Sequence, residues 1–182
     1  MRATNVTPTG VERPFLDDEI IVSKTDLKGR LTYVNRLFVT ISGYPEDELI
    51  GQPHNVIRHP DMPRAVFALL WERIQAGEEL FGYIVNMAAD GGHYWVLAHV
   101  TPTFDGQGRV VGYHSNRRTV SKETVARITA IYRDILREER RHDHTPTAIE
   151  AGRRRLDEIL AETGMSYDEF VWSLAGTEEA AA

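Results

Sequence analysis

One short stretch of the chain carries most of the side chains that could do chemistry. The run from Gly51 to Pro63 reads GQPHNVIRHPDMP and holds two His, one Arg, one Asp and one Asn among three Pro. Proline restricts the backbone, and binding residues are often found on such polar loops. Imidazole and guanidinium groups can donate to phosphates, hydroxyls or ring carbonyls. The run therefore predicts the wall of a binding pocket rather than a simple connector.

The rest of the sequence carries no catalytic signature. The absence of Cys excludes disulfides, thiolate metal sites and cysteine nucleophiles. The spacing of His, Asp and Glu predicts no metal cluster, and neither a nucleophile elbow nor a phosphate loop is present. Gly106, Gly108 and Gly112 have the wrong spacing for a dinucleotide fingerprint, so we interpret Asp105–Gly108 as a hairpin turn. We therefore expect a protein that is not an enzyme.

Composition narrows the class of protein further. The 182 residues are 42% hydrophobic and 26% charged, as in a soluble globular protein. The net charge of −6 makes the chain a poor general binder of nucleic acid. No apolar run approaches the roughly 20 residues that span a membrane, and the N-terminus has no secretory pattern. We expect a cytoplasmic protein.

The elements that must position the polar run follow an α+β order. Strands are predicted at 20–23 and 31–35, short helical segments at 36–41 and 46–50, and a longer helix at 64–76. Three more strands are predicted at 81–87, 93–103 and 109–116, joined by glycine turns. This order predicts a five-stranded antiparallel sheet with helices on one face.

The second face of this sheet also needs a cover, because residues 93–100 are apolar or aromatic on both sides. A loose N-terminal lead-in, the C-terminal helices or a second subunit could supply it.

A long helix is predicted at 122–141, a second from an N-cap at Thr145 to about 162, and a last one to 174 with a Ser166–Glu169 capping box. We divide the chain into a lead-in (1–15), a sensor domain (16–120), a helical extension (121–176) and a tail (177–182).

Several short motifs occur together in one order. They are Asn35 after the second strand, Gly43-Tyr44, the run EDELIG at 46–51 and the run DGGHYWV at 90–96. In this order they resemble a PAS domain over roughly residues 16–120. Within PAS domains, the run HNVIRHPDMP at 54–63 is similar to the type found in the aerotaxis receptor and related chemoreceptors.

The resemblance implies a non-covalently bound FAD whose redox state is the signal. The positions that the family associates with flavin binding or signalling correspond here to Asn35, His54, Arg58, His59, Asp61, Trp71 and Asn86. It also implies a homodimer that signals through its C-terminal helices to a chemoreceptor or kinase pathway. The chain departs from the family pattern at Leu80-Phe81, where members often carry Trp, and at Met87-Ala88-Ala89, where they often carry basic residues.

Alternative interpretations remain open at this stage. Trp71 could be plain core packing, Asn35 a helix cap, and Arg58 with Asp61 an ion pair that fixes the loop. Heme is a second candidate cofactor, with His54 or His59 as the ligand. A cofactor-free PAS module for dimerisation is a third possibility. A helix-turn-helix outline at 156–174 lacks Arg and Lys in its last helix, which opposes phosphate contact.

Overall fold

The computed structural model describes residues 6–175, which divide into two compact units. The first unit comprises residues up to 59 together with 73–119. The second comprises residues 60–72 together with 120 onward. The segment 60–72, which the sequence analysis assigned to the sensor domain, therefore groups with the C-terminal helices. The predicted tail at 177–182 lies outside the described residues.

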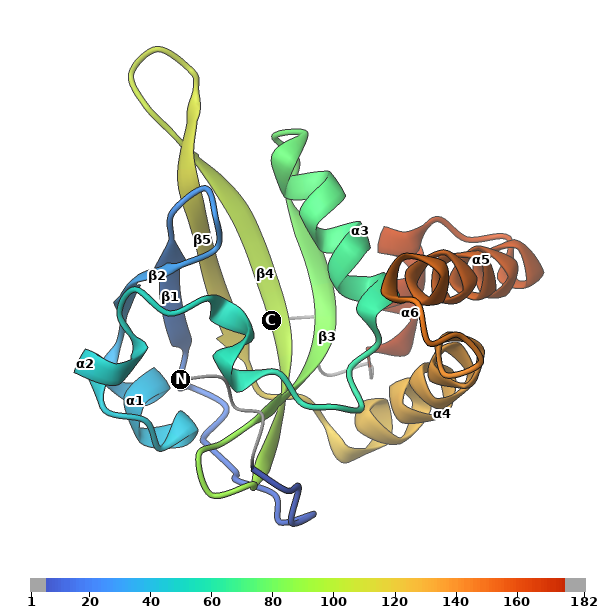
Figure 1. Ribbon diagram of the computed structural model, residues 1–182, viewed down its shortest axis with the longest axis horizontal. Coiled ribbons are helices and arrows are strands. Elements are labelled where there is room, and N and C mark those ends of the chain that lie inside the picture. Colours follow the sequence, from blue (N-terminus) through green and yellow to red (C-terminus); the bar gives the residue numbers. More distant parts are fainter. Residues whose placement is uncertain (1–5, 176–182) are drawn as a thin grey trace. The chain divides into compact units, whose positions relative to one another are not determined.

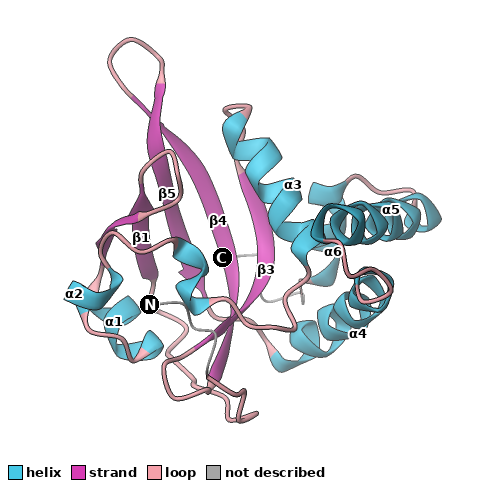
Figure 2. Ribbon diagram, in the orientation of Figure 1, coloured by secondary structure: helices cyan, strands magenta, loops and turns pink. Residues whose placement is uncertain are grey.

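The first unit is built on a five-stranded antiparallel sheet (Figures 1 and 2). The strand order is β2-β1-β5-β4-β3. The strands are β1 (Ile21–Thr25), β2 (Leu31–Val34), β3 (Leu80–Met87), β4 (His93–Phe104) and β5 (Val110–Arg118). The predicted sheet is thus confirmed, and β5 extends two residues beyond its predicted end at 116.

The turn between β4 and β5 shows how the sequence sets the register. Oδ1 of Asp105 accepts from the backbone N–H groups of Gln107 at 2.9 Å and Arg109 at 3.0 Å. Gly108 supplies the left-handed conformation, with a φ of 75°. The hairpin predicted from the Asp-Gly pattern is therefore confirmed.

Strand pairing places a defined set of residues on one face of the sheet, called here the inner face. Ser23 on β1 pairs with Ser115 on β5, and Ser115 also pairs with Val100 on β4. Tyr94, six residues before Val100 on the same strand, pairs with Asn86 on β3. Because side chains alternate with a period of two, all five residues point to the same face.

Short helical segments cover this inner face within the first unit. They are α1 (Arg36–Ser42), α2 (Glu46–Leu49) and the 3₁₀ helix η1 (His54–Ile57). The Phe38 ring on α1 lies under the Arg117 guanidinium of β5, 5.6 Å away, and contacts the His54 ring edge-on. The polar run predicted as a pocket wall is thus a short helix that packs on the sheet.

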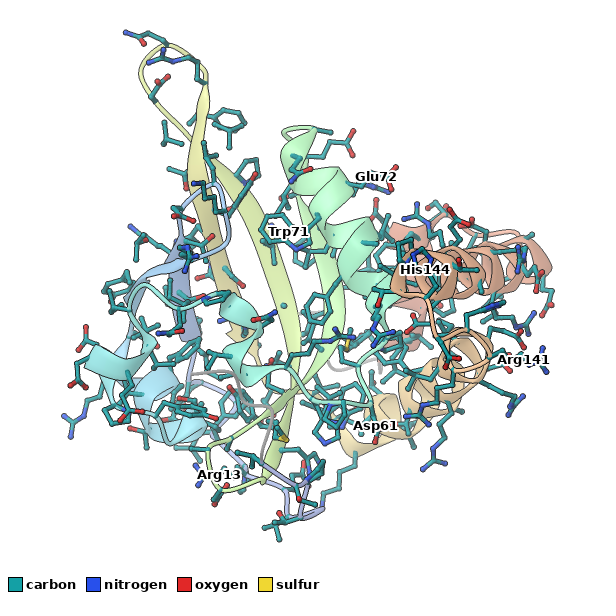
Figure 3. All side chains as sticks on the ribbon, in the orientation of Figure 1. Arg13, Asp61, Trp71, Glu72, Arg141 and His144 are labelled. Atoms are coloured by element: carbon teal, nitrogen blue, oxygen red, sulfur yellow. The ribbon has the colours of Figure 1, made fainter. Side chains whose placement is uncertain are left out.

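The N-terminal segment is an ordered part of the first unit. The backbone of His93, at the start of β4, accepts from the Arg13 N–H and donates to the Val11 carbonyl, both at 2.8 Å. The Arg13 side chain, labelled in Figure 3, donates to the Ile41 carbonyl at 2.9 Å and to Asp90 at 2.6 Å. The prediction of a loose lead-in was wrong, because backbone pairing with β4 anchors it.

The second unit consists of α4 (Lys122–Glu139), α5 (Thr145–Thr163), α6 (Tyr167–Leu174) and the segment 60–72, which begins α3 (Arg64–Gln75). One buried polar contact in this unit is made by the side chain of Glu139, which is only 3% exposed. This carboxylate accepts from the backbone N–H groups of Arg64 at 3.1 Å and Ala65 at 2.8 Å. It therefore caps the N-terminus of α3, where free N–H groups and the helix dipole favour an anion.

The predicted helix ends of the second unit are partly corrected. The capping box of Ser166 and Glu169 is present at the start of α6, as predicted. The N-cap of α5 is His144 rather than Thr145, because the helix includes Thr145 ahead of its early proline. Within residues 6–175, no helix is both long and apolar enough to cross a membrane.

A glycine in α5 tests how tightly the second unit is packed. A Cβ on Gly152 would lie 2.6 Å from Oε1 of Glu139 and 3.0 Å from the Cβ of Ala65. We predict that Gly152→Ala lowers the free energy of unfolding by about 1–3 kcal/mol, although Ala is the better helix former. Urea unfolding of both proteins measures this difference.

The matched control is Gly106→Ala, because a Cβ there would meet no atom within 4 Å. We expect that control to remain within about 0.5 kcal/mol of the parent protein. A Gly152→Ala protein as stable as the parent would contradict the packing seen around Glu139.

Candidate functional site

The inner face holds four buried polar atoms that have no hydrogen-bond partner among the residues that the structure describes. They are Nδ2 of Asn86, the hydroxyl of Tyr94, Oγ of Ser115 and Nη1 of Arg117. All four belong to the same face, because Arg117 lies two residues after Ser115 on β5. Buried polar groups in folded proteins nearly always have partners. A cluster of unsatisfied groups on one face therefore indicates a place where a polar ligand binds.

Arg117 is held in position by residues from three other elements. Its Nη2 donates to Oγ of Ser23 on β1 at 3.0 Å and to Nε2 of His54 on η1. Its guanidinium lies over the ring of Phe38 on α1. The side chain is only 3% exposed, so the second nitrogen, Nη1, lies inside the protein. These contacts leave Nη1 available to a ligand.

Electrostatics fix the protonation states around Arg117. Burial lowers the pKa of the guanidinium to about 10, so it remains charged at neutral pH. Burial, and then the charge of Arg117, lower the pKa of His54 to about 3. His54 is therefore neutral, and its Nε2 is the acceptor for Arg117. Burial also raises the pKa of Tyr94, which keeps that hydroxyl protonated.

Two further predicted residues, Arg58 and His59, lie near this face or at its edge. Arg58 follows η1 and forms an isolated backbone bridge with Asn86 on β3. His59 is buried, with its ring edge-on to His93 at a centroid distance of 6.0 Å. The structure therefore brings His54, Arg58 and Asn86 to the part of the first unit that carries the unsatisfied groups.

Asn35 has a structural role. Its Oδ1 accepts from the backbone N–H groups of Phe38 at 3.1 Å and Val22 at 3.0 Å, and its Nδ2 donates to the Ile20 carbonyl at 2.8 Å. The amide thus caps α1 and ties it to β1. We infer that Asn35 supports the site by positioning α1 and Phe38.

The remaining two predicted residues, Asp61 and Trp71, belong to the second unit. The Asp61 carboxylate accepts from the Arg140 side chain at 2.9 Å, and both side chains are 64% exposed. Trp71 is half-buried on α3. Figure 3 labels both residues with Glu72, whose carboxylate contacts Arg153 of α5 at 3.0 Å.

Four inner-face residues were missed by the sequence analysis: Ser23, Tyr94, Ser115 and Arg117. Arg117 and Arg118 fell outside the predicted strand, so the face of Arg117 was not considered. Extending the alternation from Tyr113 through Ser115 would have placed Arg117 on the buried side. A basic residue at such a position signals either a buried ion pair or a ligand contact.

No group of three or more His, Asp or Glu in the described part of the chain could hold a metal ion. The inner face instead offers hydrogen-bond donors, one buried cation and aromatic rings. Such a surface suits a polar, planar organic ligand with an anionic or carbonyl edge.

Comparison with known proteins agrees with this architecture. Residues 31–117 match a family model described as the PAS fold. This segment is a PAS domain. A relative, the aerotaxis receptor of Escherichia coli K12, is 42% identical over 122 residues, covering 67% of this chain and 24% of the receptor. The biofilm dispersion protein BdlA of Pseudomonas aeruginosa is 31% identical over 97 residues, covering 53% of this chain and 23% of that protein.

Two further proteins are similar to this chain. The nitrogen fixation regulatory protein of Klebsiella pneumoniae is 28% identical over 102 residues, covering 56% of this chain and 21% of that protein. A light-oxygen-voltage domain studied with a flavin analogue superposes with a TM-score of 0.57 at 19% identity, over 64% of this chain and 88% of that one. The last similarity shows the fold alone. The chain spans only about a quarter of the curated relatives it matches.

The depressed pKa of His54 predicts a pH dependence of stability. The unfolded state takes up a proton near pH 6.5, whereas folded His54 does not until about pH 3. Stability is therefore fully present above pH 6.5 and is lost as the pH falls toward 3. Between pH 7 and pH 5 the free energy of unfolding of the parent should fall because His54 is neutral in the folded state. We predict that the fall is about 1–2 kcal/mol smaller in His54→Asn.

Urea unfolding at several pH values measures this difference, and His144→Asn, at an exposed position, is the control. Histidine NMR signals offer a direct check, since His54 should not titrate above pH 5. Titration of His54 near pH 6.5 would contradict its assignment as a neutral acceptor.

Proposed function

We propose that this chain is a sensory PAS protein that binds FAD non-covalently and reports its redox state to a signalling partner. The observation that carries the proposal is the set of buried, unsatisfied polar atoms on the inner face. The similarity to the aerotaxis receptor gives it further support. The coarser assignment, a PAS domain related to signalling proteins, rests directly on the comparisons.

The residues present fit a flavin. Asn86 could donate through Nδ2 to a ring carbonyl, and Ser115 and Tyr94 could donate or accept at the ring edge or the sugar chain. Arg117 and Arg58 could bind the phosphates or an electron-rich ring edge. A bound flavin supplies reversible electron transfer, which changes the charge and hydrogen bonding of the ring. Because the chain has no Cys, its response cannot use the thiol bond of light-sensing flavin domains.

Two stretches of chain lead from the site to the second unit. Arg58 and His59 run directly into Pro60, where the second unit begins. Strand β5, which carries Ser115 and Arg117, runs through Thr119 into α4. A shift of the side chains at the site therefore has covalent routes to the helices. We propose that these helices signal in a chemotaxis or kinase pathway, in a protein that forms a homodimer.

Heme held by His54 is less compatible with the site than flavin. Nε2 of His54 accepts a hydrogen bond from the Arg117 guanidinium, so the nitrogen that would bind iron faces a cation. The charge of Arg117 also opposes a second positive centre at the same place. We therefore favour flavin, and heme is one outcome that the following experiment would detect.

The test is a visible absorption spectrum of the purified protein before and after dithionite. We predict two flavin bands that bleach on reduction, and a reduction of FAD affinity by roughly tenfold or more in Asn86→Ala, because a buried donor is lost. Titration of ligand-free protein with FAD, followed by flavin fluorescence, measures the affinity.

Asn116→Ala is the matched control, since Asn116 lies on β5 but on the opposite face from Ser115 and Arg117. A Soret band would show that the cofactor is heme and not flavin. A colourless protein that stays colourless with added FAD would reject the flavin proposal and favour a cofactor-free interaction module.

A further inference from the structure

Arg117 is a buried cation whose charge the protein leaves uncompensated. Across residues 6–175, no carboxylate forms an ion pair with it, and the titratable group that raises its pKa against the effect of burial is the hydroxyl of Tyr94. That hydroxyl is protonated at neutral pH because burial raises its pKa. The guanidinium itself keeps a pKa of about 10 and remains charged.

The groups that hold Arg117 are neutral. Ser23 accepts through its hydroxyl, His54 through an uncharged imidazole, and Phe38 offers its ring face. These contacts fix the orientation of the side chain without cancelling its charge. Burying a charge without a counter-ion is costly. Such a buried charge is stabilised when a bound ligand supplies the missing counter-ion.

We propose that Arg117 selects an anionic ligand, which places a negatively charged group against Nη1. This inference rests on the proposed function, since FAD can offer that charge from two sources. One source is its phosphates, and the other is the flavin ring, which gains electron density on reduction. Arg117 is thus the residue that distinguishes charged from uncharged ligands at the inner face.

The competing interpretation is that Arg117 is a structural cross-link between β1, β5 and η1. A cross-link also explains the bonds of Nη2 to Ser23 and His54. It does not explain why Nη1 is buried without a partner. The two interpretations predict opposite effects of removing the charge on the stability of the ligand-free protein.

The experiment compares Arg117→Met and Arg117→Gln with the control Arg118→Met, at the adjacent, exposed position of β5. Each protein is stripped of flavin in urea and refolded. We expect both Arg117 variants to unfold at a urea concentration equal to or above that of the parent, because an uncompensated charge has been removed. We expect their FAD affinity to fall roughly 10- to 100-fold, since a charge-assisted hydrogen bond is lost. Arg118→Met should match the parent in both measurements.

Titration with riboflavin, FMN and FAD identifies the source of the anion. If the Arg117 variants lose affinity only for FMN and FAD, Arg117 binds a phosphate, which supports the selection of an anion. An equal loss of affinity for reduced riboflavin, with none for the oxidised form, assigns Arg117 to the reduced ring and also supports the selection of an anion. An equal loss for oxidised riboflavin, which is uncharged, would overturn the selection of an anion.

The inference is overturned if Arg117→Gln, which keeps donors for Ser23 and His54, binds FAD as tightly as the parent. If the parent binds none of the three flavins, the proposed function fails separately. In that case ligand-free stability decides: a gain in the Arg117→Met protein supports a ligand-directed charge, and a loss assigns Arg117 to structure.

Discussion

The buried charge of Arg117 is the constraint on which the inner face of the sheet depends. A guanidinium removed from water must be solvated by protein groups or by a ligand. Ser23 and His54 supply acceptors from β1 and η1, so segments distant in sequence meet at one side chain. His54 can serve only while it is neutral, and the same charge that it solvates helps to keep it so. The hydrogen bonds that orient the Arg117 side chain are therefore maintained across the physiological pH range.

The register of the strands brings polar residues that are distant in sequence together on one face. Asn86, Tyr94, Ser115 and Arg117 come from three strands, and only the pairing of β3 with β4 and of β4 with β5 brings them to one face. A slip of one residue between β4 and β5 would place Ser115 and Arg117 on the opposite face from Tyr94, and a slip between β3 and β4 would do the same to Asn86. The turn at Asp105, which binds two backbone N–H groups, helps to prevent that slip. Local turn chemistry thus controls the placement of groups many residues away.

The sequence predicted the sheet and its hairpins, because alternation, Asp-Gly turns and capping residues are local signals, and it named His54, Arg58 and Asn86 among the residues of the candidate site. It did not predict the role of Arg117, since burial of a charged side chain depends on contacts with β1, α1 and η1. It also failed for the N-terminal segment, whose order comes from pairing between Val11, Arg13 and His93. For Asn35, the helix cap considered from sequence is present as the bond from the Phe38 N–H, and the bonds to Val22 and Ile20, which tie the amide to the chain at β1, were not predicted. The correct predictions rest on local propensity, and the wrong or missing ones concern residues whose structure depends on pairing between distant segments.

The second unit joins segment 60–72 to α4 and α5 by contacts of very different strength. The ion pairs of Asp61 with Arg140 and of Glu72 with Arg153 involve exposed carboxylates, and such pairs contribute about 0–1 kcal/mol. The buried carboxylate of Glu139 accepts two N–H groups at the start of α3, and hydrogen bonds to a charged group contribute about 1.5–3 kcal/mol each. Glu139 therefore makes the strongest of these polar contacts. Because that segment follows directly after Arg58 and His59, a displacement of the chain at Pro60 would reach α4 in part through this buried side chain.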